Sequence, residues 1–249
     1  MSNRSEQIGT AAWGRADLHI HTRCSDGGPS PEQVVQHVLR RGHLEVIAIT
    51  DHNRIEGALR AREAAEGSAL QVVIGEEVST ADGHLLALFI REPVAPGLSM
   101  AETIAQVHAQ DGLAIAAHPF DPISHGLLGR GSLMRSLDEV AELPLDGMET
   151  LNASLVRQVG NAVSQVIAQR FGFTGVGGSD AHHLAVIGRA YTLFPGRTAE
   201  DLRRAIIAGT ATAAGRRWRW SQYLSWICGC LIPRTARRVY RVARSARLA

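Results

Sequence analysis

The feature that most constrains the fold is an alternation of short apolar runs and amphipathic segments between Ala16 and Gly215. The runs have the length of buried strands, and the amphipathic segments have the spacing of helices. The predicted strands are Ala16–His21, Val46–Thr50, Val72–Ser79, His84–Ile90, Ala114–His118, Gly147–Leu151 and Thr174–Ser179. The predicted helices are Pro31–Arg41, Ile55–Glu66, Ser99–Asp111, Leu133–Glu142, Leu155–Phe171 and Thr198–Ala208. Short strands separated by helices indicate parallel βα units, arranged as a barrel or a doubly wound sheet.

Size and composition narrow the class of protein. The chain has 249 residues, enough for one α/β barrel, and its 45% hydrophobic and 20% charged residues exclude disorder, collagen and coiled coil as overall classes. No apolar run reaches the roughly 20 residues that cross a bilayer. The first 30 residues lack a basic start followed by an apolar core, so we expect no secretory signal. Three cysteines are too few for a disulfide framework. We therefore expect a cytoplasmic protein.

Charge divides the chain unevenly. Residues 216–249 hold nine of the 26 basic residues and no acidic residue, which leaves 17 basic residues against 24 acidic ones in the rest. We expect a leader at residues 1–15, a main domain at 16–215 and a basic tail, rich in tryptophan and arginine, at 216–249. One face of a predicted basic helix in the tail holds Ala236, Val239, Tyr240 and Ala243. The tail suits three roles: lying on an anionic membrane surface as a peripheral anchor, packing on the domain or a second subunit, and binding nucleic-acid phosphate.

Histidines and carboxylates stand at the ends of nearly all predicted strands. The first strand ends His19-Ile20-His21, and because side chains alternate along a strand, both imidazoles lie on one face and can bind one metal ion. Asp26 follows in a Ser-Asp-Gly turn that can return its carboxylate to the same place. The other strand ends contribute His52, Glu77, His84, His118, Asp180 and His182. Since strand ends share one face in a parallel α/β fold, we expect these nine side chains to meet at one rim.

The ligand chemistry indicates several divalent ions. Imidazoles and carboxylates favour manganese, iron or zinc over copper(I) or an iron–sulfur cluster. One ion rarely takes more than about six protein ligands, so nine predict two or three ions with at least one bridging carboxylate. Structural or surface roles are expected for the remaining histidines of the domain other than His125, namely His37, His43, His108 and His183.

The motifs DLHIHT, SDG, TDHN, GEEVST, GHLLAL, AHPF and GGSDAH resemble, in order and spacing, those of the PHP (polymerase and histidinol phosphatase) superfamily. The resemblance extends from about Ala16 to Gly215. It implies an α/β fold of the distorted seven-stranded (β/α)7 barrel type, with the basic helical tail added, a trinuclear metal site and phosphoester hydrolysis. Members of the superfamily include histidinol-phosphate phosphatase, nucleotide phosphatases, 5′–3′ exoribonucleases and editing domains of bacterial DNA polymerases.

The resemblance also assigns roles to individual residues. It gives the first ion His19, His21, Glu77 and Asp180, the second Glu77, His84 and His118, and the third Asp26, His52 and His182. It implies that Asp180, Glu77 and His182 are catalytic. A water bridging two ions would lose a proton near neutral pH, and the hydroxide would attack phosphorus in line. The expected substrate-binding arginines are Arg23, Arg130 and Arg189.

Two further residues have expected roles near the ions. We expect Asp51 to orient a ligand histidine, and His125 is a candidate proton donor to the leaving group. The predicted function is hydrolysis of a phosphate ester in a small phosphorylated metabolite or nucleotide. The alternatives are a 5′–3′ exonuclease acting on RNA or DNA oligonucleotides at the same site, a non-catalytic metal-binding scaffold, and a metal amidohydrolase.

Overall fold

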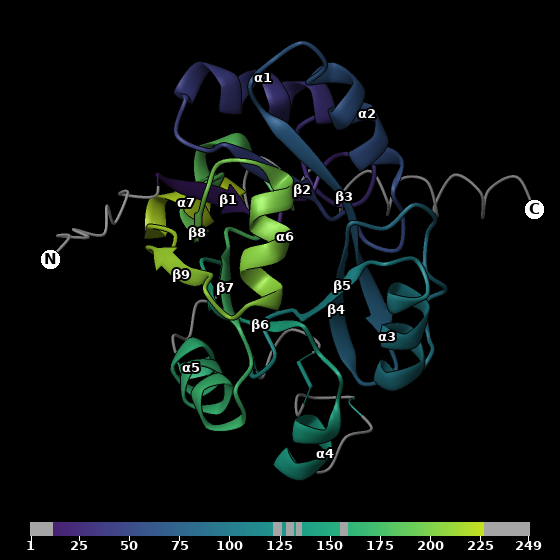
Figure 1. The fold of residues 1–249 in the computed structure, drawn as a ribbon. Coiled ribbons are helices and arrows are strands. Elements are labelled where there is room, and N and C mark those ends of the chain that lie inside the picture. Colours follow the sequence, from purple (N-terminus) through teal and green to yellow (C-terminus); the bar gives the residue numbers. More distant parts are fainter. Residues whose placement is uncertain (1–11, 122–125, 128–131, 133–135, 155–158, 227–249) are drawn as a thin grey trace, which may run out of the picture.

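The computed structural model describes residues 12–121, 126–127, 132, 136–154 and 159–226. Their strands form one nine-stranded sheet in the order β7-β6-β5-β4-β3-β2-β1-β8-β9. These strands are β1 (Trp13–Asp17), β2 (Val46–Ile49), β3 (Gln71–Thr80), β4 (Gly83–Leu88), β5 (Leu113–Ala116), β6 (Gly147–Asn152), β7 (Gly175–Gly178), β8 (Ala190–Pro195) and β9 (Thr212–Gly215). The sheet curves into a nearly closed barrel with helices arranged around it (Figure 1).

The described helices are α1 (Pro31–Arg41), α2 (Glu56–Ala64), α3 (Met100–His108), α4 (Leu137–Glu142), α5 (Val159–Phe171), α6 (Ala199–Ile207), α7 (Trp220–Trp226) and the 3₁₀ turn η1 (Leu184–Val186). Local capping explains where several of them begin. At α1, the Ser30 hydroxyl accepts a hydrogen bond from the Gln33 N–H, and the Gln33 side chain accepts one from the Ser30 N–H. This reciprocal pair satisfies two backbone donors that a helix start leaves free.

Strand direction determines which ends reach the rim. β1, β2 and β3 are parallel, and so are β5, β6 and β7, whereas β4 runs antiparallel to both of its neighbours. A tight hairpin joins β3 to β4, with Thr80 opposite Gly83 and Ser79 opposite His84. The antiparallel β4 therefore starts at the rim where the parallel strands end, so its first residues can join a site there.

The barrel closes between the segments that follow β7 and β1. The Ile20–Ala181 bridge is parallel, the His21 N–H donates to the Ala181 carbonyl at 2.9 Å, and the Ala181 N–H donates to the His19 carbonyl at 3.2 Å. The expected barrel is confirmed. The expected count of seven strands is wrong, because β8 pairs antiparallel with β1, and β9 with β8, so the sheet extends past β1.

The central strands β2 and β5 are buried on both faces. All four residues of β2 are fully buried, with Val46 and Ala48 in one apolar cluster and Ile47 and Ile49 in the other. Apolar side chains of α1, α2, α3 and α5 belong to the cluster that contains Ile47. Apolar side chains of α6 belong to the cluster that contains Val46. Burial on both faces accounts for continuous apolar runs in place of alternating ones.

Packed structure is present on both sides of residues 16–215. β1 begins at Trp13, inside the expected leader, and ends at Asp17, so His19 and His21 follow the strand. At the other end, Trp218 is 3% exposed and its indole N–H donates to the Ser179 carbonyl at 3.0 Å, so the packing continues past residue 215. The predicted tail helix lies outside the described residues. Within the described part of the chain, no helix has the length and apolar character needed to span a bilayer.

Candidate metal centre

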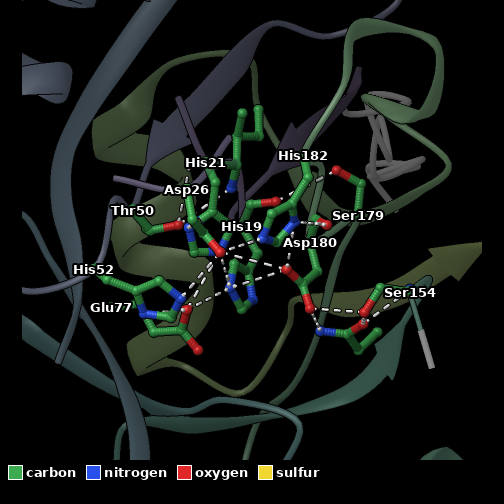
Figure 2. A network of polar contacts seen from close by, with 12 residues as sticks. His19, His21, Asp26, Thr50, His52, Glu77, Ser154, Ser179, Asp180 and His182 are labelled. Carbon is green, nitrogen blue, oxygen red and sulfur yellow. Dashed lines mark hydrogen bonds and ion pairs between the residues drawn. The ribbon is translucent and has the colours of Figure 1, made fainter. Parts of the chain in front are cut away.

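All nine predicted ligands come together at the rim of the barrel. They lie after β1 and in the loop that follows it, after β2, β5 and β7, within β3 and at the start of β4. Their nitrogen and oxygen atoms form five overlapping groups of three, and together these groups include every one of the nine residues. Figure 2 shows most of these side chains pointing toward one another from separate segments of the chain.

The tightest group contains His19, His21, Glu77 and Asp180. Nε2 of His19 lies 3.1 Å from Nε2 of His21, and these two nitrogens lie 3.3 and 3.2 Å from Oε2 of Glu77. Oδ1 of Asp180 is 3.7 and 3.4 Å from the same nitrogens. Ligands at about 2.0–2.1 Å from a tetrahedral ion would be about 3.3–3.4 Å apart. The spacing of these four atoms therefore fits one ion.

Glu77 is shared between two groups. Its other oxygen, Oε1, lies 2.8 Å from Nδ1 of His84 and 3.0 Å from Nε2 of His118. One carboxylate thus presents an oxygen to each group, which is the arrangement expected of a bridging ligand.

The third expected group is built around Asp26. Its Oδ2 lies 3.0 Å from Nε2 of His182 and 3.8 Å from Nε2 of His52. The His52 ring also faces Glu77, with Nδ1 3.2 Å from Oε2, so His52 lies between the Asp26 and Glu77 groups. The geometry therefore groups His52 with Glu77 and His84 as well as with Asp26.

The buried carboxylates of the centre also favour the binding of cations. Glu77, Glu149 and Asp180 are all buried, and the ion pairs of these carboxylates among the described residues are with histidines. Burial by itself would raise the pKa of Glu77, but the neighbouring His84 and His19 hold it well below its usual value. Burial by itself would lower the pKa of His21, yet Asp180 and Glu77 raise it to about 10. The buried carboxylates are negatively charged, and in the metal-free protein they favour protonated imidazoles. Divalent ions bound in place of those protons would balance the charge of the carboxylates.

A layer of polar residues behind the ligands was missed by the sequence reasoning. Glu149 accepts from Nδ1 of His19 at 3.0 Å with one oxygen, and from the His118 N–H at 2.8 Å with the other. A carboxylate that accepts from Nδ1 leaves the Nε2 lone pair free for a metal ion. Glu149 lies inside the sixth predicted strand and not at its end, so the strand-end rule did not single it out.

Asp180 is held from behind as well. Its Oδ2 accepts from the Ser154 hydroxyl at 2.7 Å and from Nδ2 of Asn152 at 3.3 Å, and Asn152 also donates to Glu149. Ser154 is in turn contacted by α7, because the Tyr223 hydroxyl donates to its carbonyl at 2.8 Å. The ligands are therefore oriented by hydrogen bonds from β6 and from the segment that follows it.

Comparison with known proteins identifies the family. A model of the PHP domain matches residues 17–124, and a model of the PHP-associated region matches residues 156–211. An uncharacterized protein of Methanocaldococcus jannaschii is 37% identical over 150 residues, which are 56% of this chain and 82% of that protein. The chain belongs to the PHP family. The matched segments include the expected motifs from DLHIHT to GGSDAH.

Two further similar proteins are informative. The phosphoribosyl 1,2-cyclic phosphate 1,2-diphosphodiesterase of Eggerthella lenta is 36% identical over 129 residues, 47% of this chain and 48% of that enzyme, so the match spans about half of the enzyme. A two-domain protein of Bacteroides vulgatus, which contains a predicted PHP-like metal-dependent phosphoesterase, superposes with a TM-score of 0.70 at 19% identity. That superposition covers 82% of this chain and 65% of the other, and it shows the shared fold. The expected class, metal-dependent phosphoesterase, is confirmed at the level of the family.

Asp51 of this PHP domain has a different role from the expected one. Its Oδ1 accepts from the Thr22 N–H at 2.7 Å and from the Ser25 hydroxyl at 2.6 Å, and its Oδ2 accepts from the Thr22 hydroxyl at 2.6 Å. The expectation that Asp51 orients a ligand histidine is therefore wrong. Instead, Asp51 holds the loop that carries Asp26.

The structure describes two of the three expected substrate-binding arginines, Arg23 and Arg189. Arg23 is exposed and donates to the Gln33 side chain at 3.3 Å, three residues before Asp26 in the chain. Arg189 donates to the Arg217 carbonyl at 2.8 Å and lines a separate concavity. Arg130 and the candidate proton donor His125 lie outside the described residues. Substrate binding by these arginines stays a prediction.

Proposed function

We propose that this PHP-family chain hydrolyses a phosphate ester of a small phosphorylated metabolite or nucleotide. One observation carries the proposal: nine imidazole and carboxylate ligands from seven segments of the chain meet at one rim, with buried carboxylates that pair with histidines. The 36% identity to a cyclic-phosphate diphosphodiesterase supports phosphate as the group acted upon.

Two or three divalent ions would be held by these residues. We assign the first to His19, His21, Glu77 and Asp180, the second to Glu77, His84 and His118, and the third to Asp26, His52 and His182. Manganese, iron and zinc all suit these ligands. Such ions activate water at neutral pH and balance the charge of the phosphate oxygens.

The chain itself supplies orientation. Glu149 fixes the tautomer of His19 so that Nε2 faces the first site. Asn152 and Ser154 hold Oδ2 of Asp180, which leaves Oδ1 directed at His19 and His21. We propose Asp180, Glu77 and His182 as the catalytic residues because they join the three groups: Glu77 the first and second, and Asp180 with His182 the first and third.

The test compares two aspartates. Asp180→Asn should remove a ligand charge, lower the metal content of the purified protein and abolish phosphate release, because one missing ligand leaves the first site incomplete. Asp111→Asn is the matched control, since Asp111 is exposed and both aspartates have positive φ, 50° at Asp180 and 59° at Asp111, which asparagine tolerates. Metal content and phosphate release from monoesters, a cyclic phosphate, mononucleotides and 5′-phosphorylated oligonucleotides would be measured.

Each outcome decides between the alternatives. Turnover of small esters with two or three bound ions supports the proposal. Turnover confined to oligonucleotides would mean a nuclease, and bound ions with no turnover would mean a scaffold. Wild-type activity in Asp180→Asn would refute the assigned centre.

A further inference from the structure

A second concavity lies outside the metal centre. Its volume is about 550 Å³, and it is bordered by the end of α1, the segment after η1, the β8–β9 edge and the start of α7. β8, β9 and α7 stand together at the left of Figure 1. Four arginines line this space, Arg41, Arg189, Arg216 and Arg219, and we call it the arginine pocket. None of the nine metal ligands lines it, and its size is that of a small-molecule site.

The charge in the arginine pocket is unbalanced. No aspartate or glutamate is among the residues that line it. Four described arginines form ion pairs with carboxylates, for example Arg60 with Glu32 and Arg197 with Glu45, and the arginines of the pocket are not among them. A concavity lined by charges of one sign concentrates ions of the other sign. It stands on a domain whose residues outside the tail are acidic overall.

The wall of the pocket also holds an unused hydrogen-bond donor. Nε of Arg189 is buried without a hydrogen-bond partner in the described structure. Burial, followed by the charges of Arg219 and Arg216, lowers the pKa of Arg189, so the folded chain keeps these cations together against their repulsion. Both features impose a free-energy cost that a bound anion would relieve.

We propose that the arginine pocket binds a small oligophosphate anion, such as the phosphate chain of a nucleoside di- or triphosphate. Guanidinium groups present forked donors that match phosphate oxygens in pairs. Four of them around one concavity match the several charges of an oligophosphate better than the one or two of inorganic phosphate. The side chain of Tyr191, under the Arg15 guanidinium, offers an aromatic surface beside them.

The experiment uses the full chain stripped of metal and kept in EDTA, so that binding at the metal centre does not contribute. Tripolyphosphate, ATP and inorganic phosphate would be titrated in a calorimeter. We expect saturable binding of tripolyphosphate and ATP, and binding of inorganic phosphate that is weaker by about tenfold or more, since each charge-assisted bond is worth about that factor. Binding should weaken as salt is added.

Two variants and two controls locate the site. Arg219→Gln and Arg41→Gln should each weaken tripolyphosphate binding by about tenfold, because each removes one guanidinium while Arg189 stays in place to hold the Arg217 carbonyl. Arg62→Gln, an exposed arginine on α2, should leave the affinity unchanged. Asp180→Asn should leave it unchanged too, which separates this proposal from the proposed phosphoesterase activity. Circular dichroism would establish that each variant is folded.

Three results would overturn the proposal. The first is no saturable binding of tripolyphosphate or ATP. The second is an equal loss of affinity in Arg62→Gln and Arg219→Gln, which would mean general attraction to a basic surface. The third is a loss in Asp180→Asn alone, which would move the binding to the metal centre.

Discussion

Replacing Glu149 by glutamine tests whether the layer behind the ligands controls metal binding. Glutamine keeps the shape of the side chain but has one acceptor oxygen where glutamate has two. Glu149 uses both, with Oε1 accepting from the His19 ring and Oε2 from the His118 N–H and from Asn152. The substitution therefore removes one buried acceptor without opening a cavity.

Both orientations of the new amide disturb the centre. If its oxygen stays toward His118, its NH₂ group faces Nδ1 of His19, and the His19 proton must move to Nε2, the nitrogen assigned to the first ion. If the amide is reversed, its NH₂ group faces the buried His118 N–H, which then has no acceptor. An unsatisfied buried donor of this kind lowers the free energy of unfolding by about 1–3 kcal/mol. Partners of this kind change metal affinity by about 10–100-fold, or about 1.4–2.8 kcal/mol.

Metal affinity would be measured by calorimetric titration of Mn²⁺ or Zn²⁺ into the metal-free protein. Glu76→Gln is the control, because Glu76 precedes Glu77 on β3, faces the other side of the strand and binds the Val94 N–H. Burial raises the pKa of Glu76 to about 7, so a neutral amide is tolerated there. A folded Glu149→Gln variant with wild-type metal affinity would refute the role of Glu149, and so would an equal loss in Glu76→Gln.

Four further outcomes are expected. Chelation with EDTA should lower the melting temperature, and restoring metal at 100 times its Kd should recover about 2.7 kcal/mol of unfolding free energy for each occupied site, measured by scanning calorimetry. Because the pKa of His21 is raised to about 10, the ring should be protonated at neutral pH when no metal is bound. A metal ion must displace that proton, so the metal affinity should rise with pH. Calorimetry in buffers of different ionisation enthalpy should detect the released proton. Thr198→Ala removes the hydroxyl that caps α6 by accepting from the Asp201 N–H at 3.0 Å. It should lower the free energy of unfolding, measured in urea, by about 1 kcal/mol. Trp218→Ala should cost about 3–5 kcal/mol in the same assay, since the ring is 3% exposed.

Signals within a few residues made most of the helices, and the meeting of the nine proposed ligands, predictable. α1 has the expected bounds, Pro31–Arg41, because Ser30 caps its start and Gly42, with a φ of 57°, ends it in the left-handed region. The ligands were predictable because a polar residue directly after a buried apolar run has few structural reasons to be there. This argument needs only the order of residues along the chain.

Contacts between distant segments account for what was missed. The Ala190–Pro195 strand has an alternating pattern, but its pairing with β1 determines both its existence and the early start of β1 at Trp13. Glu149 acquires its role from His19, 130 residues away, and Asp51 from Thr22, 29 residues away. No local pattern shows which buried carboxylate faces which ring.

Backbone conformation supports the same view of the centre. His118 and Asp180, two proposed ligands, have φ values of 28° and 50°, a region that residues other than glycine seldom adopt and that costs about 1–3 kcal/mol each. The His118 N–H is held by Glu149, which also fixes the His19 ring. Gly178 allows this approach, because a Cβ there would lie 2.5 Å from Oε1 of Glu149 and 2.6 Å from Cβ of His19. One carboxylate thus restrains a strained turn and the ring of a proposed ligand together, so its loss should lower both the metal affinity and the stability of the fold.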